Sequence, residues 1–178
     1  MIGNDIVDLQ LAKIQSNWKR EKWLQKLFTE RELQCISSSA YPEIEVWVLW
    51  SRKEAAYKAH QRRFGFKSKF NPKSFENQND AVNINGFRYQ TSTHQTQKYV
   101  YSIAKIIGTE PFSEVFEQEI SVRAQFADKM LQRLGDSSLI SFRKDKNGVP
   151  ILCINNVPSE ISFSFTHHGK YNAYTVIF

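Results

Sequence analysis

The sequence has few cysteines and no long hydrophobic run, and these two absences argue against several protein classes. Its 178 residues include two cysteines, Cys35 and Cys153, which stand far apart and match no metal-ligand spacing. We therefore expect reduced thiols and no disulfide framework. No apolar run approaches the roughly 20 residues that span a bilayer, and the N-terminus lacks the features of a signal peptide. These absences predict a cytoplasmic protein.

The sequence does have a globular composition and an excess of positive charge. Hydrophobic residues make up 41% of the chain and aromatic residues 13%. A chain of this length buries roughly 70% of its unfolded surface, which is enough for a core of its own. We expect one domain. The formal net charge of +6 favours acidic partners such as nucleic acid, an anionic membrane, or an acidic protein or ligand.

Apolar spacing and capping residues predict a helical first third after a short N-terminal strand. The strand is expected over 1–8, and an amphipathic helix over 11–24. The sequence T-x-x-E at 29–32 is a capping box, which starts a further helix that ends near 37–39. Pro42 then fits the first turn of a broadly apolar helix over about 43–62. We expect this to be the buried central helix.

The remainder is predicted to be mostly strand. Residues 81–122 look β-rich, with strands over 99–107 and 115–122 and a hairpin turn at Asn85-Gly86. A helix over 124–134 follows, with Gly135 as its stop. Further strands are expected over 139–143, 149–154, 161–165 and 171–177. No internal repeat and no linker is evident, so the class is α+β in one compact domain.

The first motif with chemical meaning is a pair of carboxylates, Asp5 and Asp8, which follow Gly3 at the end of the predicted strand. Carboxylate oxygens are ligands for Mg²⁺, which usually takes one or two of them together with water and substrate phosphates. The alternative for this segment alone is that Asp5 or Asp8 caps the following helix.

The second motif lies on the predicted central helix, in the segment WSRKEAAYKA over 50–59. Helical spacing puts one set of side chains on a single face, namely Trp47, Trp50, Glu54 and Lys58. A carboxylate that continues an apolar stripe is costly to bury without a partner. A metal would satisfy Glu54, and Lys58 would neutralise a phosphate oxygen. The alternative is a solvated Glu–Lys pair, which contributes about 0.2–0.5 kcal/mol.

The third motif is the segment SFSFTHHG over 162–169, in which hydroxyl side chains alternate with phenylalanines. Ser164, Thr166 and His167 are candidate hydrogen-bond donors to a phosphate. A zinc site is disfavoured because His167 and His168 are adjacent and point to opposite sides of a strand. The alternative is a half-buried strand whose polar face lies in solvent.

Taken in this order, the three motifs resemble the 4′-phosphopantetheinyl transferase superfamily. Its pattern joins a strand G-x-D-I-V-E/D, a helix F/W-S/A-x-K-E-A-x-x-K, and a late S-x-S/T-H element ahead of a Y-A-x-A strand. The matching segments here are GNDIVD over 3–8, WSRKEAAYK over 50–58 and SFTH over 164–167. Minor elements of the family, F-S/T-x-x-E and G-x-P, are matched at 28–32 and 148–150.

The resemblance implies both a fold and a reaction. The fold would be α+β, of the 4′-phosphopantetheinyl transferase type, with an antiparallel sheet packed against a long central helix. The reaction would move the 4′-phosphopantetheine arm of coenzyme A to a serine of an apo acyl or peptidyl carrier protein and release 3′,5′-ADP. Such a reaction demands positioning and charge neutralisation, as other phosphoryl transfers do. The positive charge suits the acidic carrier proteins of the family.

The resemblance also assigns the acidic residues and one lysine. It implies that Asp5 and Glu54 ligate Mg²⁺, which bridges the diphosphate of coenzyme A. Lys58 is implied to stabilise charge on the phosphate under attack. The base that removes the serine proton is either Glu54 or a metal-bound water.

The remaining site residues are implied to bind coenzyme A. Lys53 and His167 would contact its phosphates, and His167 and Thr166 would lie nearest the 3′-phosphate. Ser164, in the same late segment, is a further donor to coenzyme A.

The motif order is similar to that of single-unit holo-[acyl-carrier-protein] synthases, whereas two-unit members put the S-x-S/T-H element first. Single-unit members complete their sites between subunits, so the resemblance implies a homo-oligomer, commonly a trimer. The chain is longer than these members. We assign the excess to a β-rich insertion near 76–122 within a single domain over 1–178.

Two alternatives stay open on the sequence alone. The first is a relative that binds coenzyme A but transfers nothing, although the intact Asp5, Lys53, Glu54 and Lys58 argue against lost chemistry. The second is a basic nucleic-acid-binding domain, for which RRFGFKSKF over 62–70 supplies aromatic and basic side chains. That reading leaves the acidic pair unexplained. We therefore expect neither nucleic acid nor a membrane among the partners.

Overall fold

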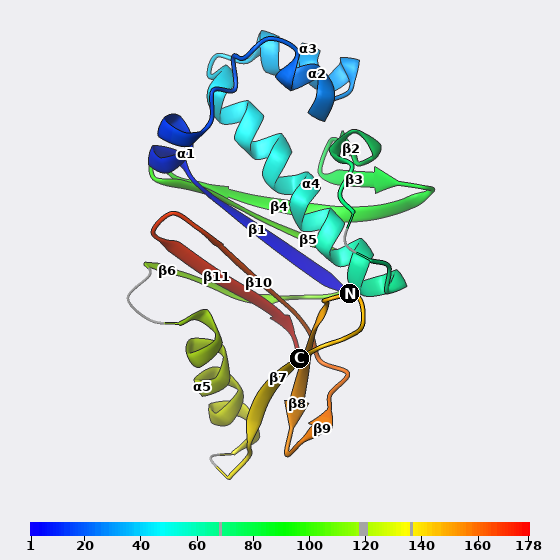
Figure 1. The fold of residues 1–178 in the computed structure, drawn as a ribbon, viewed down its shortest axis with the longest axis vertical. Coiled ribbons are helices and arrows are strands. Elements are labelled where there is room, and N and C mark those ends of the chain that lie inside the picture. Colours follow the sequence, from blue (N-terminus) through cyan, green and yellow to red (C-terminus); the bar gives the residue numbers. More distant parts are fainter. Residues whose placement is uncertain (68, 118–120, 136) are drawn as a thin grey trace.

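The protein combines helices with antiparallel sheets, which confirms the predicted α+β class (Figure 1). The computed structural model describes residues 1–67, 69–117, 121–135 and 137–178. Within these ranges, no helix is both long and apolar enough to cross a membrane. The helices are α1 (Leu9–Gln15), α2 (Trp23–Leu27), α3 (Glu30–Ser38), α4 (Pro42–Phe64), α5 (Val122–Leu134) and the short 3₁₀ helix η1 (Pro72–Ser74).

The first half of the chain builds a five-stranded antiparallel sheet in the order β1-β5-β4-β3-β2. Its strands are β1 (Ile2–Asp8), β2 (Glu76–Gln78), β3 (Ala81–Ile84), β4 (Phe87–Gln95) and β5 (Tyr99–Lys105). Asn85 and Gly86 form the predicted turn between β3 and β4, with φ angles of 48° and 79°, as a two-residue hairpin loop requires. β1 pairs with β5 along its whole length. The N-terminal strand is thus an edge strand of this sheet.

Along the chain, the second half resembles the first: a strand comes first, a helix follows it, and further strands complete the half. It opens with a strand, β6, which pairs with the last strand of its half just as β1 pairs with β5. Helix α5 follows β6, as α4 follows β1. A small separate sheet of β7, β8 and β9 and a closing hairpin of β10 and β11 complete the half. The strands are β6 (Phe112–Glu117), β7 (Ile140–Lys144), β8 (Pro150–Ile154), β9 (Val157–Pro158), β10 (Ser162–His168) and β11 (Tyr171–Ile177).

The β-rich stretch over 76–122 does not stand apart as an insertion. Its first four strands complete the sheet that contains β1, and β6 then begins the second half. The strands of the predicted insertion are thus part of the sheet that contains β1, and the assignment of a single domain over 1–178 stays a prediction. Positions 118–120, inside the strand predicted over 115–122, lie outside the described residues.

Helix α4 is the predicted central helix and lies across the face of β1 and β5 (Figure 1). Pro42 stands in its first turn, and Gly65, with a φ of 61°, ends it. Gly3 lets β1 approach the helix closely. A Cβ atom at Gly3 would overlap the backbone oxygen of Ala55 and lie 2.6 Å from the backbone nitrogen of Ala59. This contact brings β1 and α4 together beside the predicted acidic residues.

The segment before α3 differs from the prediction of one helix over 11–24. Helix α1 ends at Gln15 and α2 begins at Trp23, so the apolar spacing does not continue through one helix. Ile14, one of the apolar residues on which the prediction of this helix depends, is 83% exposed. The capping box at the start of α3 is confirmed, with both of its hydrogen bonds present. Local capping was therefore a better guide here than a sparse apolar pattern.

Candidate active site

The free edge of β1 is held by side chains of β10, from the other half of the chain. Three alternate backbone N–H groups of β1 donate to three alternate side chains of β10. The pairs are Asn4 to Ser164 Oγ at 3.3 Å, Ile6 to Thr166 Oγ1 at 3.3 Å, and Asp8 to His168 Nδ1 at 2.9 Å. Alternate residues of a strand share a face, so the pattern S-x-T-x-H binds β1 and leaves His167 on the other face.

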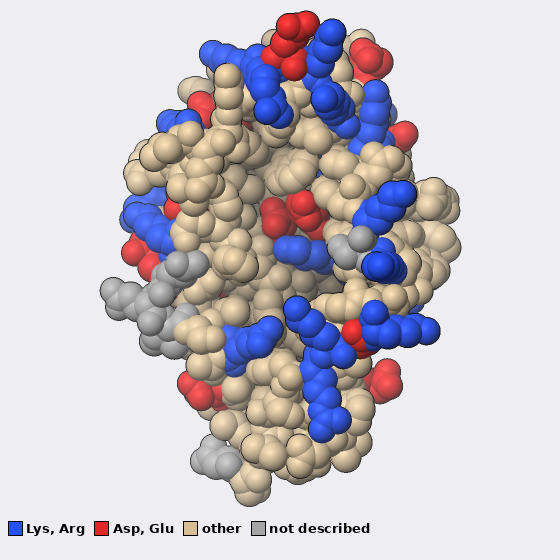
Figure 2. All heavy atoms as spheres, viewed as in Figure 1, with Lys and Arg blue, Asp and Glu red and all other residues tan. Residues whose placement is uncertain are grey.

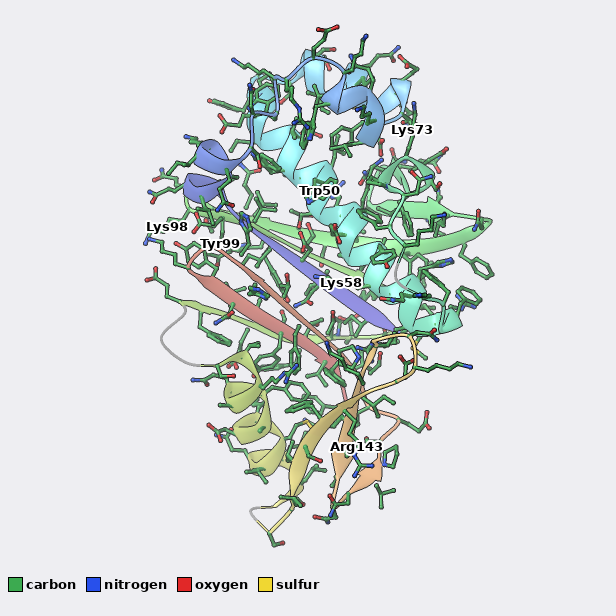
Figure 3. All side chains as sticks on the ribbon, viewed as in Figure 1. Trp50, Lys58, Lys73, Lys98, Tyr99 and Arg143 are labelled. Carbon is green, nitrogen blue, oxygen red and sulfur yellow. The ribbon has the colours of Figure 1, made fainter. Side chains whose placement is uncertain are left out.

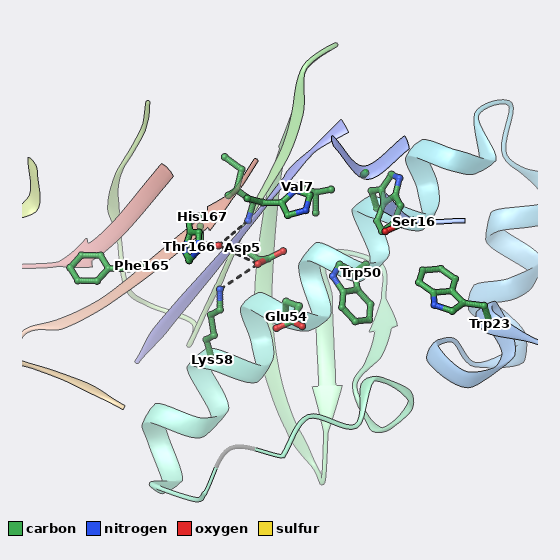
Figure 4. Close-up of a pocket in the computed structure, with 14 residues that line it drawn as sticks. Asp5, Val7, Ser16, Trp23, Trp50, Glu54, Lys58, Phe165, Thr166 and His167 are labelled. Atoms are coloured by element: carbon green, nitrogen blue, oxygen red, sulfur yellow. Dashed lines mark hydrogen bonds and ion pairs between the residues drawn. The ribbon is translucent and has the colours of Figure 1, made fainter. Parts of the chain in front are cut away.

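A cavity of about 490 Å³ opens where α4, β1 and β10 meet (Figure 4). On the face shown in Figure 2, acidic and basic atoms lie together in a central hollow, while other Lys and Arg side chains spread around its rim. The cavity is lined by Asp5, Ile6, Val7, Ala12, Ser16, Trp23, Trp47, Trp50, Glu54, Lys58, Phe165, Thr166, His167 and His168. Both halves of the chain therefore contribute to one cavity.

Asp5 is the carboxylate at the centre of this arrangement. Its Oδ1 atom accepts hydrogen bonds from Lys58 Nζ and Thr166 Oγ1, each at 3.3 Å. Burial raises the pKa of Asp5, and Lys58 and the Thr166 hydrogen bond act in the opposite direction. Asp8, the other predicted carboxylate, instead caps α1 by accepting from the backbone of Gln10 and Leu11. Of the two alternatives for this motif, helix capping therefore applies to Asp8, whereas Asp5 faces the cavity.

Glu54 faces the same cavity from α4, one turn before Lys58. Burial, and to a smaller extent the charge of Asp5, raise its pKa to about 7, although the charge of Lys58 acts in the opposite direction. Across the described ranges, no hydrogen bond or ion pair of its carboxylate is found. Glu54 is thus a half-buried acid that no cation of the described residues contacts directly.

These two carboxylates fit a hard divalent cation. Only one cation, Lys58, contacts either of them in the described part of the chain, and it contacts Asp5 alone. Burial and then the charge of Asp5 raise the pKa of Glu54, and a second cation beside the two carboxylates would offset both effects. No cluster of three or more His, Cys, Asp or Glu side chains occurs among the described residues. Two carboxylates with open space beside them suit Mg²⁺, which keeps several waters and binds substrate phosphates.

Lys58 extends from α4 along the same side as Trp50 (Figure 3). Its Nζ atom donates to the backbone oxygen of Asn4 at 2.9 Å and to Asp5 Oδ1 at 3.3 Å. An ammonium group has three N–H donors, so one remains for a ligand. The side chain is 29% exposed, which leaves it accessible from the cavity.

Lys53 does not reach the cavity, contrary to the prediction that it contacts phosphate. Its side chain is fully buried on another face of α4, where Nζ lies 2.7 Å from Glu32 Oε2. It also donates to the backbone oxygens of Leu27 and Pro72 at 2.9 and 3.0 Å. All three of its donors are thus used, and Lys53 fastens the segments before α3 and at η1 to the central helix.

The candidate residues of the third motif, over 162–169, line two different cavities. Thr166 and the exposed His167 line the large one, and their contacts with phosphate stay a prediction. Ser164 is buried and lines a second cavity of about 230 Å³, together with Lys58, Arg62 and Phe165. The hydroxyl of Thr166 is engaged by Asp5 and Ile6. In this structure Thr166 therefore orients a carboxylate.

Sequence reasoning missed the side chains that α1 and α2 bring to the cavity, chiefly Ser16 and Trp23. No local pattern marks them, because the turn between the two helices carries them there. The segment over 62–70 also behaves differently from a base-stacking surface. Phe66 and Phe70 pack against Tyr57 with ring centroids 6.1 and 4.8 Å apart. Position 68 lies outside the described residues.

Residues 1–112, well over half of the chain, match the family model of the 4′-phosphopantetheinyl transferase superfamily. The chain belongs to this superfamily. Members take coenzyme A as a substrate and act on carrier proteins. The match ends at the start of β6, so it includes Asp5, Glu54 and Lys58 but not Thr166 and His167.

The chain also matches a solved structure, the holo-[acyl-carrier-protein] synthase (AcpS) of Thermotoga maritima. The identity is 12% over 88% of this chain and 83% of that chain, with a TM-score of 0.39. No curated protein matches the sequence. The family assignment thus rests on the match over 1–112.

Proposed function

We propose that this protein transfers the 4′-phosphopantetheine arm of coenzyme A to a serine of an apo carrier protein, as a holo-[acyl-carrier-protein] synthase does, and releases 3′,5′-ADP. The observation that carries the proposal is the single cavity in which Asp5, Glu54 and Lys58 meet Thr166 and His167. Family membership supplies the reaction class. The cavity contains the two elements that phosphoryl transfer needs, a pair of carboxylates and a cation beside them.

Asp5 and Glu54 would hold the Mg²⁺ ion. When bound, the ion neutralises charge on the diphosphate of coenzyme A. Thr166 donates to Oδ1 of Asp5 and accepts from the backbone of Ile6, so it fixes how the carboxylate points. In this way the second half of the chain orients a ligand that belongs to the first half.

Lys58 and Glu54 would act on the reacting groups themselves. The remaining N–H of Lys58 would donate to the phosphate whose negative charge grows during attack. The serine oxygen forms a bond to the phosphorus that carries the arm, and the bond from that phosphorus to the oxygen of 3′,5′-ADP breaks. The serine proton must leave at the same time. We assign it to Glu54, because within the described structure its carboxylate has no partner.

The nucleotide half of coenzyme A would occupy the second cavity. Lys58 and Phe165 line both cavities, so the two cavities adjoin beside Lys58. Arg62 and Ser164 are polar donors in the second cavity. Burial lowers the pKa of Arg62 to about 10, and Asp145 opposes the shift, so the guanidinium is charged at neutral pH and suits a phosphate.

The carrier protein would approach the mouth of the large cavity beside α1 and α2. Ser16 and Trp23 line the cavity there, and the exposed basic residues of the same segment are Lys13, Lys19, Arg20, Lys22 and Lys26. With a formal net charge of +6 for the chain, this segment favours an acidic partner and speeds its encounter. A cytoplasmic location, where carriers for fatty acid synthesis act, completes the proposal.

One chain would suffice for catalysis. A homo-oligomer, commonly a trimer, was expected from single-unit members that share their sites between subunits. Here β10 of the second half lies along β1 of the same chain, which supports a site within one polypeptide.

Intact-mass spectrometry of apo carrier proteins tests the proposed reaction. The protein, coenzyme A and Mg²⁺ are incubated with one apo carrier each from fatty acid, polyketide and peptide synthesis. We expect at least one carrier to gain one phosphopantetheine arm, and a chelator to prevent the gain. If no carrier gains the arm while coenzyme A still binds, the protein is a silent relative and the proposed transfer is wrong.

A further inference from the structure

The interface between the two halves of the chain contains a polar pair among apolar side chains. Gly3 packs against α4, so Ile2, Asn4 and Ile6 share the other face of β1. That face meets the second half, whose hairpin of β10 and β11 lies beside β1 (Figure 1). Ile2 and Ile6 pack there in an apolar cluster with Tyr101, Ile103, Tyr171 and Ala173. Asn4, between them on β1, is fully buried.

The partner of Asn4 is Tyr101 of β5, which is 5% exposed. Asn4 lies opposite Ile103 and Tyr101 lies opposite Ile6, so the two side chains are diagonal neighbours on paired strands. Nδ2 of Asn4 donates to the hydroxyl of Tyr101 at 3.2 Å, and this hydroxyl donates to the backbone oxygen of Tyr174 at 3.3 Å. The pair thus connects β1 and β5 of the first half with β11 of the second.

The hydroxyl of Tyr101 is enclosed by polar groups of the second half. Burial raises its pKa to about 12, although hydrogen bonds with Asn4, Ser113 and Thr175 act in the opposite direction. The hydroxyl is therefore protonated at neutral pH and donates to Tyr174. Since Ser113 belongs to β6 and Thr175 to β11, two strands of the second half hold this one group.

Stability alone does not account for a polar pair at this place. Oδ1 of Asn4 is buried, and across the described residues it has no hydrogen-bond partner. An unpaired buried acceptor destabilises a protein, whereas apolar groups of similar shape in place of both partners are often neutral or stabilising. The pair adds direction instead. Hydrophobic contact is non-directional, whereas a hydrogen bond requires a particular distance and angle.

Direction matters because the bonds between β10 and β1 do not define one alignment. Hydroxyl or imidazole side chains occur at every second position of β10, namely Ser162, Ser164, Thr166 and His168. A shift of β10 by two residues, about 7 Å, would again place such side chains against the backbone N–H groups of β1. The same shift would move Thr166 and His167 away from Asp5. Other contacts must therefore select the observed alignment.

The contacts of the Tyr101 hydroxyl do not repeat in this way. Ser113 and Thr175 lie opposite each other in β6 and β11, and the next such pair toward β11's start, Val115 and Ala173, is apolar. A shift of two residues in that direction would bury the hydroxyl of Tyr101 against apolar side chains. Burial of a polar group without its partners is costly.

We propose that Asn4 and Tyr101 are positioning residues for arm transfer, which select the alignment that places Thr166 and His167 beside Asp5. Neither Asn4 nor Tyr101 lines the large cavity, so both act through the strands that carry the site. The inference rests on the proposed function.

The first test compares Tyr101→Phe with the double variant Asn4→Leu/Tyr101→Phe. The single variant leaves the amide of Asn4 without its partner, whereas the double variant makes both positions apolar. We expect the single variant to lower both the thermal midpoint and kcat/KM, the latter by about 10-fold, because misplaced groups slow a reaction strongly. The double variant should recover the midpoint and not kcat/KM. If it recovers both, the pair serves stability alone and the inference is wrong.

Tyr89→Phe is the matched control. Tyr89 is fully buried in β4, and its hydroxyl bonds to Nδ1 of His60 at 2.8 Å, away from the interface of the halves. The substitution should lower the thermal midpoint and leave kcat/KM close to the wild-type value. If Tyr89→Phe loses as much transfer as Tyr101→Phe, the loss follows from any missing buried hydroxyl and the inference is overturned.

The second test reads the alignment directly and needs no activity. In the wild type, nuclear Overhauser effects should join the amide proton of Ile6 to the side chain of Thr166, whose Oγ1 lies 3.3 Å from that nitrogen. In the double variant we expect additional contacts of Ile6 with Ser164 or His168, two positions away. The inference is overturned if the double variant keeps the contact with Thr166 alone. Should the double variant not fold, Tyr101→Phe and Tyr89→Phe are compared in the same way.

The two tests separate this inference from the proposed function. If the wild type transfers the arm to no carrier, the proposed function fails, and the contacts of Ile6 still decide whether the pair sets the alignment. If the wild type transfers the arm and the double variant does so equally fast, the proposed function stands and the positioning role alone is refuted.

Discussion

The hairpins β4–β5 and β10–β11 carry similar sequences in different surroundings. β4 contains TSTH over 91–94, and β10 contains SFTH over 164–167. Thr93 bonds within its own sheet and to α4, with Ser102 Oγ at 3.0 Å and Arg52 Nε at 3.0 Å. Thr166 bonds instead to the backbone of β1 and to a cavity carboxylate. Residue types alone therefore do not define the site; the position beside the edge of β1 does.

The same contrast separates the two halves of the chain. The first half supplies Asp5, Glu54 and Lys58 and is covered by the family match, whereas the second half supplies Thr166 and His167 and lies outside it. If the hairpin comparison is right, substitutions in β10 affect transfer and equivalent substitutions in β4 do not. Variants of the two hairpins and of the cavity residues test this difference.

The largest effect is expected at the two carboxylates of the cavity, of which Asp5 accepts a hydrogen bond from Thr166 of β10. Asp5→Asn and Glu54→Gln should each lower kcat/KM for arm transfer by about 100-fold or more, because each removes a carboxylate that would hold the ion that neutralises and positions the diphosphate. Circular dichroism should show little change in structure. A fully active Glu54→Gln protein would contradict the proposal that Glu54 binds the metal ion and accepts the serine proton.

The next effect is expected at Thr166, which orients Asp5. Thr166→Val keeps the shape of the side chain and removes the hydroxyl, so we expect transfer to fall by about 10- to 100-fold, as for other groups that orient metal ligands. Thr93→Val is the matched control in β4. Its transfer rate should stay within about 2-fold of the wild type, although its stability falls slightly. Equal losses in both variants would refute the difference between the hairpins.

A smaller effect is expected at the two histidines that end the similar segments. His167 lines the cavity and His94 does not, and both are exposed. His167→Ala should raise KM for coenzyme A by about 3- to 10-fold through loss of one phosphate contact, and His94→Ala should leave it unchanged. Steady-state kinetics with varied coenzyme A decides the matter. If kcat falls while KM for coenzyme A stays unchanged, His167 acts on the reaction and not on binding.

The smallest effect concerns stability and pH. The pKa of Glu54 is raised to about 7 in the folded protein from an ordinary value of 4.5. The unfolded chain therefore loses this proton first, and the free energy of unfolding falls as pH rises from about 4.5 to 7, by about 1–3 kcal/mol. With a chelator present, Glu54→Gln should be more stable than the wild type at pH 8 and equal to it at pH 4. Urea unfolding at both pH values measures the difference.

Added Mg²⁺ extends this stability test. It should stabilise the wild type at pH 8, because binding to the folded state alone shifts the equilibrium, and it should stabilise Glu54→Gln much less. If Mg²⁺ raises the midpoints of both proteins equally, its site does not include Glu54. The β4 variant Thr93→Val should respond as the wild type does.

Local signals in the sequence were sufficient for much of the helical structure. The capping box at Thr29, Pro42 at the start of α4, Gly65 at its end and Gly135 after α5 all mark the observed boundaries. The spacing of Glu54 and Lys58 correctly placed both on one face of α4. These features depend on residues a few positions apart, which a single sequence displays directly.

Features that depend on distant residues could not be predicted in the same way. The contacts of β10 with β1 join residues 160 positions apart, and they decide which hairpin serves the cavity. The fate of Lys53 depends on Glu32, which the sequence marked only as part of a capping box. The helical repeat does place Lys53 about 100° around the axis from Glu54. That angle was a signal that the two side chains face different surroundings.

The measurement that tests the account most directly is a mixing experiment on arm transfer. Glu54→Gln lacks a residue of the first half, and the double variant Thr166→Val/His167→Ala lacks two of the second. If the site lies within one chain, a mixture of the two proteins transfers no faster than the sum of the two measured separately, while the wild type transfers readily. Recovery of a large part of the wild-type rate in the mixture would mean that the halves meet between chains, and would contradict the account.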